Sequence, residues 1–201
     1  MDSQKVFAPK NQDPQIEIHY FCGMQQKIVI TGGPGTGKST ILKVLETLSY
    51  SCLPEISREV ILEAREKGIA HLFYTDPLLF SKILLKKRQA QHAEATKKMD
   101  DLVFFDRGIP DILAYLNFAK TSPLENFKQL NKTFAYHKVF VTPPWEAIYR
   151  KDNERSETFE EAQEIHQHIC HTYAQLGYEV VEIPYGIPSE RAEFILQNLL
   201  V

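Results

Sequence analysis

The glycine-rich stretch GGPGTGKS, at residues 32–39, combines residue types that can bind a polyphosphate. Its spacing fits the pattern G-x-x-x-x-G-K-[ST], in which the backbone N–H groups of a loop converge on phosphate oxygens. The lysine adds a positive charge for the β- and γ-phosphates, and the serine adds a hydroxyl for Mg²⁺. The sequence therefore predicts a site for Mg²⁺ and a nucleoside triphosphate. The residues expected to contact the nucleotide are Gly33, Pro34, Gly35, Thr36, Gly37, Lys38, Ser39 and Thr40.

A carboxylate for the metal is expected at Asp106, which ends the apolar run LVFFD. A carboxylate at the end of a buried strand can hold Mg²⁺ together with Ser39. Arg107 follows directly, and an arginine beside the phosphates can stabilise charge during phosphoryl transfer or bind an acceptor. Two simpler interpretations stay open, in which Asp106 only caps the next helix and Arg107 forms a surface ion pair.

A second polar group lies in the stretch PEISRE, which follows a short apolar run. Glu55 is predicted to accept the proton of a substrate hydroxyl, as the base that a kinase needs and a hydrolase does not. Arg58 is predicted to bind a phosphate or a substrate carboxylate. The alternative is that the carboxylates only stabilise the first turn of a helix.

A cationic stretch, YRKDNERSE, lies between two predicted helices. Arg150, Lys151 and Arg155 are predicted to belong to a lid at about residues 150–157 that closes over the triphosphate and excludes water. The alternative is a solvated loop between helices.

Three further segments flank these groups. The turn-rich loop PYGIP, at residues 184–188, is placed to contact the purine, but nothing in it selects adenine over guanine, so ATP and GTP both fit. The predicted helix at 77–99, with Arg88 and Gln89, either lines the acceptor pocket or serves core packing. Trp145 is expected to be a core residue or to cap the start of a helix.

Short apolar runs alternate with helical patterns along the chain, which indicates a parallel sheet covered on both faces. The candidate polar residues follow strands, and in such a sheet the carboxyl ends of the strands meet at one edge, where ligands bind. Strands are predicted at 27–31, 50–54, 102–106, 137–142 and 178–184. Helices are predicted at 38–48, 57–68 with Ser57 as N-cap, 77–99 with Asp76 as N-cap, 109–119, 122–131, 145–152, 157–177 and 188–200.

Composition supports one nucleotide-binding domain at residues 25–201, preceded by a tail or edge strand at residues 1–24. The chain has 201 residues and a formal net charge of −3, without a basic stripe, so nucleic acid is not an expected partner. No apolar run approaches the roughly 20 residues that span a bilayer, and the N-terminus lacks the apolar core of a signal peptide. The three cysteines are widely spaced, which favours a reducing, cytoplasmic setting.

Taken together, the motifs ITGGPGTGKST, PEISREVI, FFDRGIPDILAYL, KVFVTPPWEAIYRKDNERSE and YAQLGYEVVEIP resemble the NadR-like AAA-domain family over about residues 26–200. These are small P-loop ATPases grouped with the nicotinamide-riboside kinase domain of NadR. The resemblance implies a kinase-like P-loop NTPase fold, a three-layer α/β/α sandwich with a five-stranded parallel sheet in the order 2-3-1-4-5. It also implies that Asp106 and Arg107 form the Walker B region, that Arg150 and Arg155 are lid arginines, and that Asp111 belongs to the substrate site.

The leading hypothesis is a Mg²⁺-dependent phosphotransferase that acts on a small hydroxyl-bearing metabolite or nucleoside. Lys38 and the loop amides would hold the phosphates, Glu55 would be the base, and Arg107 would stabilise transition-state charge. The alternative is a slow NTPase that acts as a nucleotide-dependent binding switch for a protein or lipid partner. A closed polar pocket beside the phosphate loop would favour the kinase, and a flat surface there would favour the switch.

Overall fold

The structure is a computed structural model, and it describes residues 25–69, 71–124, 126–150 and 157–199. The predicted tail at residues 1–24 and most of the predicted lid, with Lys151 and Arg155, lie outside the described residues. Among the helices of the described part, none is long and apolar enough to cross a membrane.

Five parallel strands form the sheet: β1 (Gln26–Gly32), β2 (Ser51–Leu53), β3 (Leu102–Asp106), β4 (Lys138–Thr142) and β5 (Val180–Glu182). Their order is β2-β3-β1-β4-β5, which confirms the order expected from the family resemblance. The register pairs Ile30 of β1 with Asp106 of β3 and with Phe140 of β4. Because β1 is central and ends at Gly32, the strand delivers the glycine-rich loop to the middle of the carboxyl edge.

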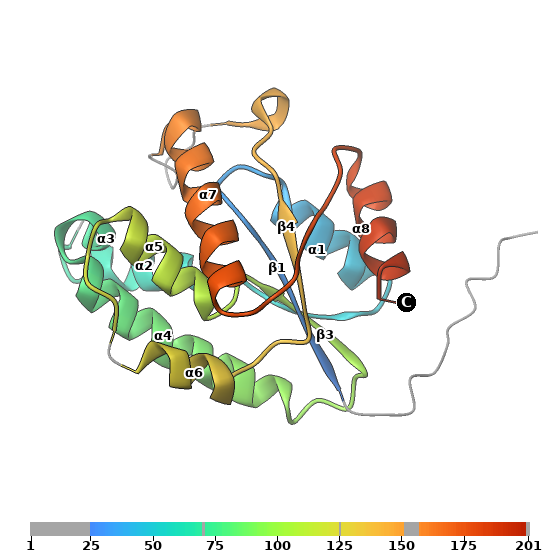
Figure 1. Cartoon of the computed structure of the whole chain (residues 1–201), viewed down its shortest axis with the longest axis horizontal. Coiled ribbons are helices and arrows are strands. Elements are labelled where there is room, and N and C mark those ends of the chain that lie inside the picture. The colour runs from blue at the N-terminus through green and yellow to red at the C-terminus, as the bar shows by residue number, and fades with distance from the viewer. Residues whose placement is uncertain (1–24, 70, 125, 151–156, 200–201) are drawn as a thin grey trace, which may run out of the picture.

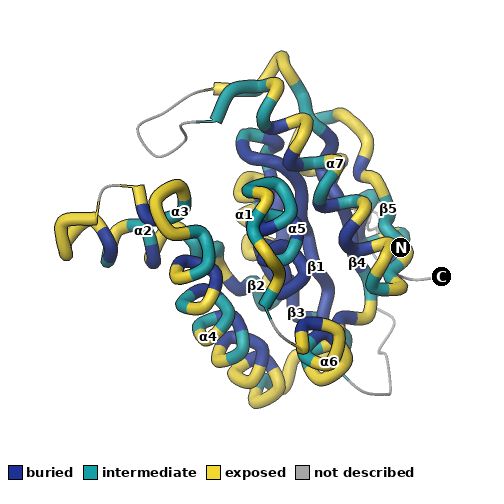
Figure 2. The backbone as a smooth tube through the Cα atoms, turned by 60° about the vertical axis from the view of Figure 1, so that its left-hand side comes forward, coloured by how far each residue is buried: buried dark blue, intermediate teal, exposed yellow. Residues whose placement is uncertain are grey.

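Successive side chains of β1 point to opposite faces of the sheet, as in any strand. Ile28 and Ile30 pack with Phe104 and Phe140 beneath α1 (Lys38–Thr47) and α8 (Pro188–Gln197). Val29 faces the other side, where α5 (Pro110–Phe118) and α7 (Phe159–Gln175) cover the sheet (Figure 1). The result is the predicted three-layer α/β/α sandwich, whose central strands β3, β1 and β4 are buried on both faces (Figure 2).

A further apolar cluster lies beside the sandwich and builds the wall of the site. It joins α5 to four more helices: α2 (Ser57–Glu66), α3 (Leu72–Thr75), α4 (Pro77–Ala95) and α6 (Phe127–Thr133). Figure 2 shows α2, α3 and α4 standing away from the sheet, on the side of α5. Asp76 caps α4 as predicted, because its side chain accepts a hydrogen bond from the N–H of Leu79 at 2.9 Å.

The structure differs from the local predictions in several places. Ser57 is the first residue of α2 and not its N-cap; Ile56 holds that position without a side-chain cap. The helix α4 ends at Ala95, and the short helix α3 was not predicted. A single 3₁₀ turn, Glu146–Ile148, replaces the helix expected at 145–152 among its described residues.

Candidate active site

One cavity of about 900 Å³ lies at the carboxyl edge of the sheet, beside the glycine-rich loop. Its floor is formed by residues that follow strands, including Glu55, Asp106 and Arg107. Helices α2 to α5 form one wall, and the loop before α8 forms the opposite wall. The predicted site residues that line it are Pro34, Gly35, Thr36, Gly37, Lys38, Ser39, Thr40, Glu55, Arg58, Arg88, Asp106, Arg107 and Asp111.

The phosphate loop has the shape that its glycines allow. Gly35 and Gly37 have φ angles of +73° and +85°, in the left-handed region where other residues are strained. A Cβ atom at Gly35 would lie 2.6 Å from Cδ2 of Tyr149, so a side chain there would collide with the ring. The Thr36 hydroxyl lies 2.6 Å from the hydroxyl of Thr142 at the end of β4, which ties the loop to the sheet.

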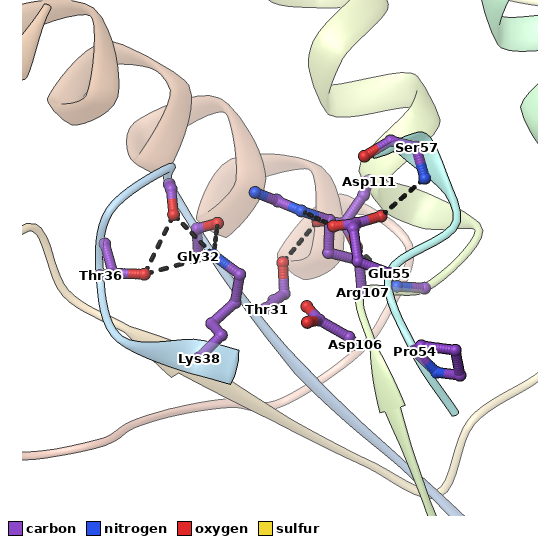
Figure 3. A network of polar contacts seen from close by, with 12 residues as sticks. Thr31, Gly32, Thr36, Lys38, Pro54, Glu55, Ser57, Asp106, Arg107 and Asp111 are labelled. Carbon is purple, nitrogen blue, oxygen red and sulfur yellow. Dashed lines mark hydrogen bonds and ion pairs between the residues drawn. The ribbon is translucent and has the colours of Figure 1, made fainter. Parts of the chain in front are cut away.

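Lys38 is folded onto the loop itself (Figure 3). Its Nζ donates to the carbonyl oxygens of Gly32 and Gly33 at 3.0 and 2.7 Å. Burial, with the positive charge of Arg107, lowers the pKa of Lys38 to about 7. An anionic ligand at the loop would stabilise the ammonium form, so phosphate binding and full protonation of Lys38 favour each other.

Asp106 is buried and incompletely paired. Its Oδ1 atom has no hydrogen-bond partner among the described residues. Burial, together with the nearby charge of Glu55, raises the pKa of Asp106 to about 6. Ser39 lines the same cavity. A hard cation held between this hydroxyl and this carboxylate would supply the missing partner and keep Asp106 ionised, so the two residues fit Mg²⁺.

Glu55 lies between two arginines. Its Oε1 atom is 2.9 Å from Nη2 of Arg88, and its Oε2 atom is 2.5 Å from Nε of Arg107. Burial alone would raise the pKa of Glu55, but Arg88 and Arg107 outweigh burial and lower it. The carboxylate is therefore ionised and fixed in orientation where it lines the cavity, and its role as a base stays a prediction.

Arg107 has a backbone conformation that is unusual for a residue with a side chain. Its φ is +68°, and its N–H donates to the carbonyl of Ile30 at 3.0 Å. Such conformations persist where the surroundings impose them and cluster at functional sites. The Nη1 atom of Arg107 also lies 3.3 Å from Oδ1 of Asp111. The guanidinium is thus held by carboxylates on two sides.

Asp111 lines the cavity, but its carboxylate is already occupied. One oxygen accepts from the Thr31 hydroxyl at 2.5 Å, and the other accepts from the Gly108 N–H at 2.8 Å and the Tyr173 hydroxyl at 2.7 Å. This side chain joins β1, the turn after β3 and α7 behind the site. The geometry favours a role in orienting Arg107 over direct contact with a substrate.

Two of the remaining predicted residues lie elsewhere, and Gly33 of the glycine-rich loop is also outside the cavity lining. Arg150 is exposed, and its Nη1 donates to the carbonyl of Tyr149 at 2.9 Å, outside the residues that line the cavity. Gln89 on α4 also lies outside the lining. Arg155, the second predicted lid arginine, falls outside the described residues, so the lid stays a prediction.

The structure adds three residues that local sequence patterns did not assign to the site. Trp145, expected in the core or as a helix cap, is the half-buried N-cap of the 3₁₀ turn and lines the cavity with Tyr185, whose ring centroid is 5.1 Å away. Arg191 lies against this pair, with its Cζ 5.8 Å from the Trp145 ring centroid. The PYGIP loop gave a partial signal for Tyr185, but no pattern in the sequence pointed to Arg191.

Comparisons with known proteins agree with this architecture. The sequence model of a family described as AAA domain matches residues 27–191. A structure of deoxyadenosine kinase from M. mycoides with bound dATP superposes with a TM-score of 0.62, at 16% identity over 88% of this chain and 100% of that one. Thymidylate kinase from Ehrlichia chaffeensis gives a TM-score of 0.62, at 15% identity over 88% of this chain and 100% of that one.

A structure of NadR in complex with NR gives a TM-score of 0.65, at 20% identity over 89% of this chain. The match covers 52% of the NadR chain, so this chain corresponds to about half of that protein. A comparison with curated proteins found no significant match. The structural likenesses show a shared kinase-type fold.

Proposed function

The chain belongs to the NadR-like AAA-domain family, and from this premise we propose that it is a Mg²⁺-dependent phosphotransferase that uses ATP or GTP. The acceptor is a small hydroxyl-bearing metabolite or a nucleoside. The observation that carries the proposal is the cavity itself. Glu55, Arg58, Arg107 and Asp111 line one cavity of about 900 Å³ together with the phosphate loop, where a flat surface would favour a binding switch.

The nucleotide end of the proposed mechanism uses the loop. Its amides and Lys38 hold the β- and γ-phosphates, and Ser39 and Asp106 hold Mg²⁺, which neutralises phosphate charge when bound. Lys38 exchanges the carbonyl oxygens of Gly32 and Gly33 for phosphate oxygens. This exchange replaces two neutral acceptors by a charged one, which strengthens the hydrogen bonds.

The acceptor end uses the pair of arginines and the carboxylate between them. Glu55 accepts the proton from the acceptor hydroxyl as that oxygen attacks the γ-phosphorus, and the bond to the bridging oxygen of the diphosphate breaks. Because Arg88 and Arg107 lower its pKa, Glu55 is a weak base that acts through position, which suits a loose transition state in which proton transfer comes late. Arg107 stays within reach of the transferred group.

The walls support an acceptor with an apolar ring. Beyond the polar floor, the lining includes Phe73, Phe80, Leu84, Ile112 and Tyr115. These side chains cannot pair with a second charged group, but they can pack against a flat ring. Deoxyadenosine kinase and thymidylate kinase, by their names, act on nucleosides and nucleotides, which is consistent with an acceptor of this kind.

A substrate panel tests the proposal. ADP release from Mg²⁺·ATP would be measured with nucleosides, nicotinamide riboside and small hydroxylated metabolites as acceptors, against water alone. At least one acceptor should raise ADP release and gain a phosphoryl group detected by mass spectrometry. If every acceptor leaves release at the rate with water, the phosphotransferase fails and slow NTP hydrolysis by a switch replaces it.

A further inference from the structure

Arg191, on α8, is a buried cation that the proposed chemistry does not use. Only 2% of the residue is exposed. Its Nη1 donates to the carbonyl oxygen of Thr36, in the phosphate loop, at 3.0 Å. The two residues are 155 positions apart in the sequence, so this contact joins α8 to the glycine-rich loop that follows β1.

The hydrogen bond fixes the orientation of one loop amide. The peptide between Thr36 and Gly37 is trans and planar, so its C=O and N–H point in opposite directions. Because Arg191 holds the Thr36 oxygen from one side, the Gly37 N–H is directed to the other side. This arrangement requires a glycine at position 37. Its φ is +85°, where a side chain would be strained, and a Cβ atom there would lie 2.9 Å from Arg191 Nη1.

The charge of Arg191 is not balanced within the described part of the chain. No carboxylate there forms an ion pair with it, and its Nε and Nη2 atoms have no hydrogen-bond partner. Burial lowers its pKa, although a guanidinium stays protonated. A buried cation with one neutral acceptor is costly unless an anion binds nearby. The loop that Arg191 touches is where the proposed function puts three phosphates.

The face of the guanidinium is also occupied. Its Cζ lies 5.8 Å from the ring centroid of Trp145, a distance at which the ring stabilises a cation. Trp145 packs on Tyr185, whose hydroxyl donates to the carbonyl of Pro144 at 2.9 Å. The aromatic pair therefore keeps the guanidinium in place, so that its Nη1 donor stays on the Thr36 carbonyl.

We propose that Arg191 is a positioning residue for phosphate recognition, which turns the Gly37 N–H toward the bound triphosphate by holding the Thr36 carbonyl from α8. The proposal rests on the proposed nucleotide site. It assigns Arg191 to the phosphates and not to the base, although the side chain lies beside the aromatic pair. An Arg191 that served the base would act on ATP and leave an anion without a base unaffected.

The test compares binding of Mg²⁺·ATP with binding of Mg²⁺·tripolyphosphate, which has no base, by calorimetry. Arg191→Met should weaken both ligands by a similar factor, at least about tenfold, because a hydrogen bond and a charge are lost. Arg191→Lys, which keeps the charge and a donor, should recover part of the loss for both. In the wild type, the Gly37 amide signal in NMR should shift when tripolyphosphate binds, and in Arg191→Met this shift should shrink.

Lys138→Met is the matched control. Like Arg191, Lys138 donates to a backbone carbonyl, that of Asn198, and its Nζ lies 5.9 Å from the ring centroid of Phe140. Unlike Arg191, it is outside the cavity lining. This variant should keep both affinities within about twofold, since the change is remote from the ligand.

Three outcomes would overturn the inference. Unchanged tripolyphosphate affinity in folded Arg191→Met would reject it, as would a loss confined to ATP. If Arg191→Met does not fold, the test uses Arg191→Lys. The inference is then rejected if this variant binds tripolyphosphate as tightly as the wild type and the Gly37 signal of the wild type does not shift. A wild type that binds neither ligand would instead reject the proposed function itself.

Discussion

The central strand β1 has a buried polar cluster at each end, and the two clusters differ in how completely their atoms are paired. At the amino end, Lys27 Nζ donates to the Thr96 hydroxyl at 2.7 Å and lies 3.2 Å from Nδ1 of His92. The other ring nitrogen of His92 lies 3.1 Å from the carbonyl oxygen of Ala135. Because an ammonium only donates, His92 must be neutral with its proton on Nε2.

At the carboxyl end, by contrast, buried atoms lack partners. Asp106 Oδ1, Arg88 Nε and two nitrogens of Arg191 have no hydrogen-bond partner among the described residues. Near the amino end, Gln25 Oε1 is also without a partner, but the buried side chains of Lys27 and His92 leave no such atom. Burying an unpaired polar group costs free energy, so the chain keeps it where something else compensates. We infer that the cluster around Lys27 is structural and that a bound ligand supplies hydrogen-bond partners for the buried atoms at the carboxyl end.

The largest expected effect tests whether the carboxyl end performs chemistry. Glu55→Gln should lower phosphoryl transfer by about 10²- to 10⁴-fold, because the amide cannot accept the proton. ATP affinity should stay near the wild-type value, since the phosphate loop is intact. Steady-state kinetics and ATP titration of the same preparation separate the two effects. A variant that keeps wild-type turnover would show that Glu55 only anchors Arg88 and Arg107.

The two buried lysines give the next test. Lys38→Ala should abolish the rise in melting temperature that ATP produces, a stabilisation of about 2.7 kcal/mol at a ligand concentration 100 times Kd. Lys27→Met should lower the melting temperature of the free protein and keep the rise with ATP, because its contacts are with His92 and Thr96. Thermal scans with and without Mg²⁺·ATP measure both. An ATP response retained in Lys38→Ala, or lost in Lys27→Met, would remove the contrast between the two ends.

Much of this arrangement could be predicted from local sequence. The strand β3 was predicted residue for residue, because LVFFD is apolar and bounded by polar positions. The phosphate loop and the Asp76 cap carry fixed local patterns. What was missed depends on contacts distant in sequence: Arg88 with Glu55, 33 positions apart, and Arg191 with Thr36, 155 positions apart. Spacing along one segment contains no record of such pairs.

The Trp145 prediction was only partly right, for a related physical reason. The residue was expected in the core or as the cap of a helix start, and it is the N-cap of the 3₁₀ turn, but its ring is half-buried in the cavity and not in the core. Its neighbours Tyr185 and Arg191 lie forty or more residues further along the chain. Burial of one aromatic ring is set by tertiary packing, which composition around the residue does not fix.

A substitution at Asp106 tests the same contrast with a smaller effect, and it is expected to raise the stability of the ligand-free protein. The pKa of Asp106 in the folded protein, about 6, is raised above its usual value. Between pH 4 and 6 the folded state therefore binds more protons than the unfolded state, so the free energy of unfolding falls as the pH rises through that range. Asp106→Asn should therefore stabilise the ligand-free protein at pH 7 by on the order of 1 kcal/mol. The same variant should weaken Mg²⁺·ATP binding. Chemical denaturation at pH 4 and 7 measures the difference, and equal or lower stability of the variant at pH 7 would contradict an unpaired carboxylate.

The smallest expected effect concerns the amino end. Burial, and less so the charges of Lys27 and His137, lowers the pKa of His92, while its bond to Ala135 opposes the shift. The aromatic rings that pack against the imidazole are uncharged: Phe105, Phe134 and Tyr136. In the unfolded chain His92 binds a proton near pH 6.5, whereas in the folded chain it stays neutral at that pH. Stability should fall as the pH drops below 6.5, by no more than about 1.4 kcal/mol per pH unit for this one group.

His92→Gln should remove that share of the slope, because an amide can accept from Lys27 and does not titrate. Denaturation curves between pH 5 and 8 compare the variant with the wild type. If His92→Gln keeps the full slope, the neutral, fully paired histidine at the amino end is wrong. The proposed difference between the two ends of β1 would then fail, because protonation of His92 in the cluster around Lys27 would not destabilise the folded protein.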